Sequence, residues 1–128
     1  DIHLFPGMEG VIRAIADKGI TMAVVSSNAL KNVKLVLGEE MTRLISLFEC
    51  QTGLFGKPPR LRKALHDAGV NPEEALSFGD EIRDIQAARQ VGIPCAAVTW
   101  GFADGAALAG YQPDYLVTDV NQILEFIS

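Results

Sequence analysis

The sequence predicts an α/β fold of three layers, in which a parallel sheet is covered by helices on both faces. Short, nearly continuous apolar runs such as the one within Gly19 to Ser26 are typical of strands buried on both faces. These runs alternate with segments of helical periodicity, and that alternation specifies parallel strands joined by helical crossovers. A chain of 128 residues fits one such domain, and no linker, repeat or low-complexity tract divides it.

The first half of the chain is predicted to contain three helices and two strands. The first helix precedes the Gly19 to Ser26 strand, between Pro6 and Gly19, with an apolar stripe of Met8, Val11, Ile12, Ile15 and Ala16. A second helix carries Leu30, Val33, Leu35 and Val36 and ends at Gly38, and a shorter one covers Met41 to Leu47. Phe48 to Thr52 is a weak strand prediction.

The second half repeats the strand and helix alternation. A helix opened by Pro58 and Pro59 and ended by Ala68-Gly69 should bury Leu61, Ala64 and Leu65, and Asn71-Pro72 should form a turn. The remaining predictions are strands at Ala75 to Gly79, Cys95 to Thr99 and Tyr115 to Thr118, with helices at Ile82 to Val91 and Val120 to Ile127.

Composition excludes several classes of protein. The hydrophobic fraction is 48%, and no apolar run approaches the roughly 20 residues that span a bilayer. The start of the chain does not read as a signal peptide. A net charge of -5 argues against nucleic acid as a partner and favours a small molecule. Cys50 and Cys95 are expected to be reduced and structural, which predicts a cytoplasmic setting.

Two groups of polar residues follow predicted strands, where parallel sheets bind ligands. Ser26, Ser27 and Asn28 lead into a helix whose free N–H groups attract an anion such as phosphate. The alternative is that Ser27 or Asn28 only caps that helix. Lys57 precedes a helix start, where its charge opposes the helix dipole, so that a nearby anion would explain it. The alternative is a solvated loop lysine.

A third group lies in the segment Phe78-Gly79-Asp80-Glu81-Ile82-Arg83-Asp84, at a turn from strand to helix. Gly79 permits close backbone approach, and Asp80 and Asp84 can converge on one side of the first helical turn. Such carboxylates suit Mg²⁺, which takes one or two protein carboxylates together with waters and phosphate oxygens. The alternative is an acidic helix N-terminus that is stabilised by the dipole alone.

In this order, Ser26, Lys57 and the segment from Gly79 to Asp84 resemble the second, third and fourth motifs of the haloacid dehalogenase-like hydrolase superfamily. Phe5-Pro6-Gly7 and Val98-Thr99-Trp100-Gly101-Phe102 also resemble its phosphoglycolate-phosphatase-like branch. The resemblance covers essentially the whole chain. It implies one Rossmann-like core domain over residues 1–128, corresponding to the part of the family that follows the cap domain.

The resemblance further implies a phosphatase that works through an aspartyl-phosphate and Mg²⁺. Ser26 would hydrogen-bond a phosphoryl oxygen, with Ser27 and Asn28 beside it, and Lys57 would stabilise the charge of phosphate and nucleophile. Asp80 would bind the metal, Asp84 would support the metal and Lys57, and Glu81 is a less certain contributor. Outside this set, His3, His66 and Trp100 are expected to be surface, helix or packing residues.

The family's nucleophile motif, Asp-x-Asp at the end of a central first strand, has no counterpart, since no two aspartates here are two residues apart. Without that strand, the strands carrying Ser26 and Asp80 should be separated and should have unpaired backbone groups. We therefore expect the sequence to be a portion of a longer protein, its first strand and cap being elsewhere in that protein or on another chain.

Three functions can be weighed against these residues. The favoured one is a Mg²⁺-dependent phosphomonoesterase acting on a small phosphorylated metabolite such as phosphoglycolate, with the nucleophile outside this chain. The second is a catalytically inactive phosphate- or metal-binding domain with a regulatory role. A receiver-type phospho-acceptor domain shares the architecture, but the order Ser26, Lys57, Asp80 is wrong for it. Substrate identity is not encoded here, because selectivity in this family comes largely from the cap.

Overall fold

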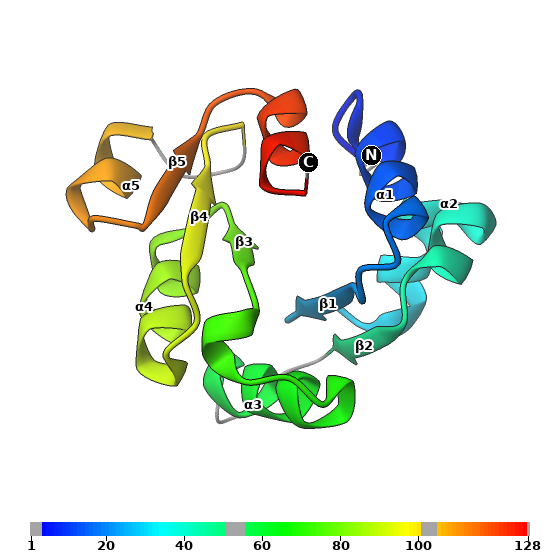
Figure 1. The fold of residues 1–128 in the computed structure, drawn as a ribbon, viewed down its shortest axis with the longest axis horizontal. Coiled ribbons are helices and arrows are strands. Elements are labelled where there is room, and N and C mark those ends of the chain that lie inside the picture. Colours follow the sequence, from blue (N-terminus) through cyan, green and yellow to red (C-terminus); the bar gives the residue numbers. More distant parts are fainter. Residues whose placement is uncertain (1–3, 51–55, 101–104, 128) are drawn as a thin grey trace.

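The computed structural model describes residues 4–50, 56–100 and 105–127, and these residues form the predicted α/β fold (Figure 1). In the first half, the elements are α1 (Met8–Asp17), β1 (Ala23–Ser26), α2 (Leu30–Leu44) and β2 (Leu47–Cys50). The second half contains α3 (Lys57–Ala68), the 3₁₀ turn η2 (Pro72–Glu74), β3 (Ser77–Gly79), α4 (Ile82–Val91), β4 (Cys95–Val98), α5 (Gly105–Gly110), β5 (Tyr115–Val117) and η3 (Val120–Phe126).

All strand pairs are parallel, but the strands form two separate sheets. The two-stranded sheet pairs β1 with β2, and the three-stranded sheet has the order β3-β4-β5. Within the described residues, no ladder joins β1 to β3, and Figure 1 shows the two sheets as distinct groups of arrows. The predicted separation of the strands that carry Ser26 and Asp80 is therefore confirmed.

Helices cover both faces of the strands, which gives three layers. Along β4, Cys95 and Ala97 pack into a cluster with α3 and α4, whereas Ala96 and Val98 pack into a cluster with α1 and η3. This alternation is the period of two that a strand imposes. A third cluster joins α1 and α2 to the two-stranded sheet. Helix α1 contributes Val11 to the cluster with η3 and Ile12 to the cluster with α2. It therefore connects the two sheets on the face that it covers.

Several element boundaries differ from the predictions. The Gly19 to Ser26 strand begins only at Ala23, and no residue of β1 is fully buried, because in the described part of the chain β1 has a hydrogen-bonded neighbour on one side only. The two helices predicted around Gly38 are one element with a kink at Gly38, whose φ of 81° is readily available to glycine. Leu47 belongs to β2 and not to that helix.

The C-terminal elements also show differences. The last helix is of the 3₁₀ type and ends at Phe126, and α5 was not predicted because its small residues, Gly105–Gly110, have no apolar periodicity. Helix α4 spans the predicted Ile82–Val91, and α3 buries Ala64 and Leu65 as expected. His3, Thr52, Gly101 and Phe102, which carried sequence predictions, lie outside the described residues.

Two further sequence expectations can be compared with the fold. Cys50 and Cys95 are free thiols, as expected, with Cys95 buried and Cys50 half-buried. None of the described helices combines the length and the apolar character that crossing a bilayer requires.

Candidate active site

Lys57 and Asp84 form an ion pair that joins the start of α3 to the first turn of α4. The Lys57 ammonium contacts Oδ1 of Asp84, and the two side chains are 20% and 8% exposed. This pair lies in a mostly desolvated setting, where an ammonium or carboxylate without a partner would be costly. The alternative that Lys57 is a solvated loop lysine is therefore wrong, and the helix that it begins is anchored to the neighbouring helix through its side chain.

The second oxygen of Asp84 organises the turn between β3 and α4. Oδ2 accepts hydrogen bonds of 3.1 Å from the backbone N–H groups of Asp80 and Glu81. Gly79 makes this possible, since a Cβ atom at that position would lie 2.3 Å from Cβ of Asp84. The close approach predicted at Gly79 is thus made by the Asp84 carboxylate, which holds the Asp80 backbone in place.

Ser26 ends β1, and its hydroxyl oxygen accepts a 3.1 Å hydrogen bond from the backbone N–H of Asn28. Because that bond uses an oxygen lone pair, the hydroxyl proton stays available for donation to an anion. Helix α2 begins at Leu30 with Ala29 as its N-cap residue and no side-chain cap bond. The alternative that Ser27 or Asn28 caps this helix is therefore wrong, and the N–H groups of its first turn have no capping side chain.

A cavity of about 250 Å³ connects these segments. Ser27, in the loop after β1, lines this cavity together with Lys57 and residues on one face of α4. The lining residues are Ser27, Gly56, Lys57, Pro58, Arg83, Gln86, Ala87 and Gln90. Ser26, Asn28, Asp80 and Asp84 are not among them. The cavity thus brings Ser27 to Lys57, and Asp84 is joined to Lys57 through their ion pair, whereas the full predicted set does not line one cavity.

The metal-binding expectation can be compared with the available oxygen ligands. Both oxygens of Asp84 already bind donors, one the Lys57 ammonium and the other two amides. Within the described residues, no group of three or more His, Cys, Asp or Glu side chains could hold a metal ion. A Mg²⁺ site, which needs few protein carboxylates, fits Asp80 and Glu81 at this turn only if further oxygens come from phosphate, water or residues outside the described set.

Sequence reasoning missed the contribution of α4 beyond its first turn. Arg83, Gln86 and Gln90 recur at helical spacing and face the cavity beside Lys57. The guanidinium of Arg83 also binds Glu81, with Nε 2.9 Å from Oε2. The spacing of these polar residues was visible in the sequence, but only the packing of α3 against α4 shows that this side of α4 faces the site.

Comparison with known proteins places this arrangement in a family context. A family model described as haloacid dehalogenase-like hydrolase matches residues 1–98. A phosphoglycolate phosphatase of Synechococcus elongatus is 31% identical over 128 residues, which are 99% of this chain and 60% of that protein. The pyrophosphatase PpaX of Oceanobacillus iheyensis is 25% identical, covering 98% of this chain and 61% of its own length.

A solved structure shows the same fold. The crystal structure of a predicted phosphoglycolate phosphatase from Haemophilus somnus matches with a TM-score of 0.88 and 25% identity, covering 98% of this chain and 58% of that one. The chain thus spans about 60% of the length of the curated relatives that it matches.

Proposed function

Because the chain belongs to the haloacid dehalogenase-like hydrolases, we propose that it forms the phosphate-binding and metal-binding part of a phosphatase for small phosphorylated metabolites. The observation that carries this proposal is the desolvated Lys57–Asp84 pair, fixed at the turn that also holds Asp80. Phosphoglycolate is a candidate substrate, since the Synechococcus relative is named for it, and pyrophosphate is another.

Each side chain has a defined part in this proposal. An ammonium carries three N–H donors, and the bond from Lys57 to Asp84 uses one, so the others can bind phosphoryl oxygens. The Ser26 hydroxyl donates a further bond, with Ser27 and Asn28 next to it. Asp84 keeps Lys57 and the Asp80 backbone aligned in advance of substrate binding, which is the preorganisation that electrostatic catalysis requires.

We assign Asp80 as the carboxylate that would hold Mg²⁺, with Glu81 as a second ligand once it releases Arg83. Asp84 would act on the metal indirectly, because its oxygens are bound to Lys57 and two amides. When bound, the ion would supply positive charge that neutralises the phosphoryl oxygens. The residues of this chain would meanwhile orient the phosphate and limit its contact with water.

The nucleophile is proposed to come from a strand that lies between β1 and β3. These strands carry Ser26 and Gly79 at their carboxyl ends, and neither has a hydrogen-bonded partner on the facing side within the described residues. An inserted strand would pair with both and would end between Ser26 and Asp80. Its source would be another segment of the same protein or a second chain, and we propose a cytoplasmic setting for the assembled enzyme.

The test uses the longest natural protein that contains this chain, assayed for phosphate release from 2-phosphoglycolate, pyrophosphate and 4-nitrophenyl phosphate with and without Mg²⁺. We expect Mg²⁺-dependent turnover that falls by about 10²–10³-fold in Lys57→Met and in Asp80→Ala. Lys18→Met is the matched control, because Lys18 is an exposed lysine at the end of α1, which leads into the opposite end of β1.

The 128-residue chain alone should show negligible turnover. Turnover by that chain that disappears in Asp80→Ala would show that the nucleophile is not outside it. The second candidate is a catalytically inactive domain that binds phosphate or metal and has a regulatory role. Phosphate binding by the longer protein without turnover or a covalent intermediate would favour this candidate and contradict the first.

A further inference from the structure

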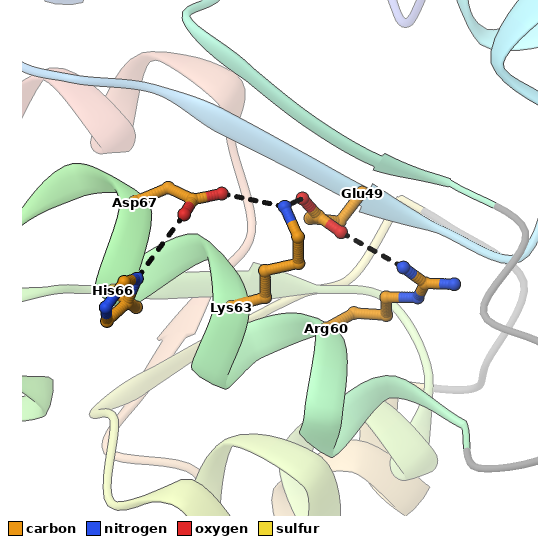
Figure 2. Close-up of polar contacts among 5 residues, drawn as sticks. All are labelled: Glu49, Arg60, Lys63, His66 and Asp67. Carbon is orange, nitrogen blue, oxygen red and sulfur yellow. Dashed lines mark hydrogen bonds and ion pairs between the residues drawn. The ribbon is translucent and has the colours of Figure 1, made fainter.

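Glu49 is a buried acid within an otherwise apolar strand, and Figure 2 shows that two cations of α3 point toward it. Its Oε2 lies 2.9 Å from the Lys63 ammonium, and its Oε1 lies 3.3 Å from Nη1 of Arg60. Its side chain is 7% exposed, whereas those of Arg60 and Lys63 are 37% and 54% exposed. Burial of a carboxylate costs free energy, so these contacts offset a penalty that an apolar residue would not incur.

The two sides of α3 are held by different interactions. Toward the three-stranded sheet and α4, Leu61 and Leu65 pack into an apolar cluster. Toward the two-stranded sheet, the α3 residues that the structure describes contribute nothing to the apolar cluster of β1 and β2, although α3 contacts both strands. That cluster lies on the opposite face of the sheet, toward α1 and α2, whereas on the α3 face Glu49 binds Arg60 and Lys63.

The position of Glu49 relates this attachment to the candidate active site. Glu49 pairs in register with Val25, one residue before the Ser26–Cys50 pair. Arg60 and Lys63 follow Lys57 on α3 within about one and about two helical turns. Glu49 therefore connects the strand pair that carries Ser26 to the helix that carries Lys57. On the other face α1 also joins the sheets, but among the residues that the structure describes no strand ladder does so.

We infer that Glu49 is a positioning residue. By binding Arg60 and Lys63, it fixes α3 on the two-stranded sheet and so sets the placement of Ser26 relative to Lys57 and Asp84. The relevance of that placement to catalysis rests on the proposed function. The structural role can be tested without any turnover, because it predicts a change in the relative orientation of the two sheets.

The test is NMR on the 128-residue protein, comparing Glu49→Gln and Glu49→Met with the unmodified chain. Residual dipolar couplings of both sheets should fit one common alignment in the unmodified protein. In both variants we expect that common fit to be lost, while each sheet still fits by itself. The side-chain ammonium of Lys57 and the amides of Ser26, Asp80 and Glu81 should shift. Glu49→Met should keep most of its stability, because an apolar residue removes the desolvation penalty and Arg60 and Lys63 can be solvated.

Asp67→Asn is the matched control, because Asp67 binds Lys63 at 2.8 Å but is not bonded to Glu49 (Figure 2). It should leave the common alignment intact. The inference is overturned if folded Glu49→Gln keeps the single alignment and the Lys57 signal, or if Asp67→Asn disturbs them equally. Should the Glu49 variants fail to fold, Lys63→Met provides the same measurement, and an unchanged alignment there also overturns it. Absence of turnover in the longer protein would leave these outcomes unaffected.

Discussion

Strands β1 and β4 are both short, apolar and parallel to their neighbours, yet they differ in burial. All four residues of β4 are buried, and Ala96 and Ala97 are 0% exposed, whereas none of the four residues of β1 is fully buried. Strand β4 pairs on both sides and β1 on one. Strand β3, which also lacks a partner on its outer side within the described residues, leaves Phe78 exposed. Burial of these strands thus follows strand neighbours as well as apolar sequence.

The candidate active site lies at the carboxyl ends of β1 and β3, and on the β3 side Gly79 is closely packed against Asp84. Gly79→Ala should have the largest effect on stability, since the new Cβ would overlap with the Asp84 side chain. We expect a loss of about 3 kcal/mol in the free energy of unfolding, measured by urea denaturation. Gly10→Ala is the control, because nothing lies within 4 Å of a Cβ at that position of α1. It should gain about 0.5–1 kcal/mol.

The charge of Asp84 is the next feature to test on the β3 side. Asp84→Asn keeps the shape of the side chain but leaves one oxygen for two sets of donors, the Lys57 ammonium and the amides of Asp80 and Glu81. Whichever way the amide turns, its NH₂ group meets a donor. We expect a loss of about 2–3 kcal/mol in urea unfolding. Glu39→Gln, which breaks an exposed ion pair with Arg43, should change stability by less than about 0.5 kcal/mol.

The sequence predicted the order and class of most elements, because apolar periodicity and Gly or Pro signals are local. It also predicted the closeness of Asp84 to Asp80 and the separation of the strands carrying Ser26 and Asp80. It did not predict the extent of β1, because an apolar run such as Ile20 to Val25 indicates burial only when neighbouring strands are present on both sides. Nor did it predict the attachment of Glu49 to α3, although an acid in an apolar strand and cations spaced along a helix were visible.

The difference in burial between β4 and β1 predicts different costs for the same substitution. Val98→Ala removes two carbon atoms from a buried site and should cost about 2 kcal/mol in urea unfolding. Val24→Ala removes the same atoms from a half-buried site on β1 and should cost less than about 1 kcal/mol. Equal costs would show that β1 is as well packed as β4. If a segment is added that inserts as a strand beside β1, Val24 should become more buried, and the costs of Val24→Ala and Val98→Ala should become more similar.

The two cysteine thiols provide the prediction with the smallest expected effect. Their reactivity again compares burial in the three-stranded sheet with burial in the two-stranded sheet. Burial raises the pKa of the Cys95 thiol on β4 to about 11, with Asp84 and Asp114 adding to the shift. At the end of β2, burial and then Glu49 raise the pKa of the half-buried Cys50 thiol. The thiolate is the form that alkylates, and Cys95 is buried as well as harder to ionise. Iodoacetamide at pH 8 should therefore modify Cys50 at least about ten-fold faster than Cys95.

The Cys95 shift also has a sign for stability. Because the pKa of Cys95 in the folded protein lies above the ordinary value of 9.0, the folded state holds the proton more tightly than the unfolded state. The protonated Cys95 thiol therefore contributes to the free energy of unfolding in full below about pH 9. This contribution declines as the pH rises toward about 11, and roughly 1 kcal/mol of it is lost by pH 10. In urea unfolding, Cys95→Ala should lose less stability than the unmodified protein between pH 8 and pH 10, since other titrating groups are common to both. Parallel pH profiles would show that ionisation of the β4 thiol is not resisted by the packing that distinguishes β4 from β1.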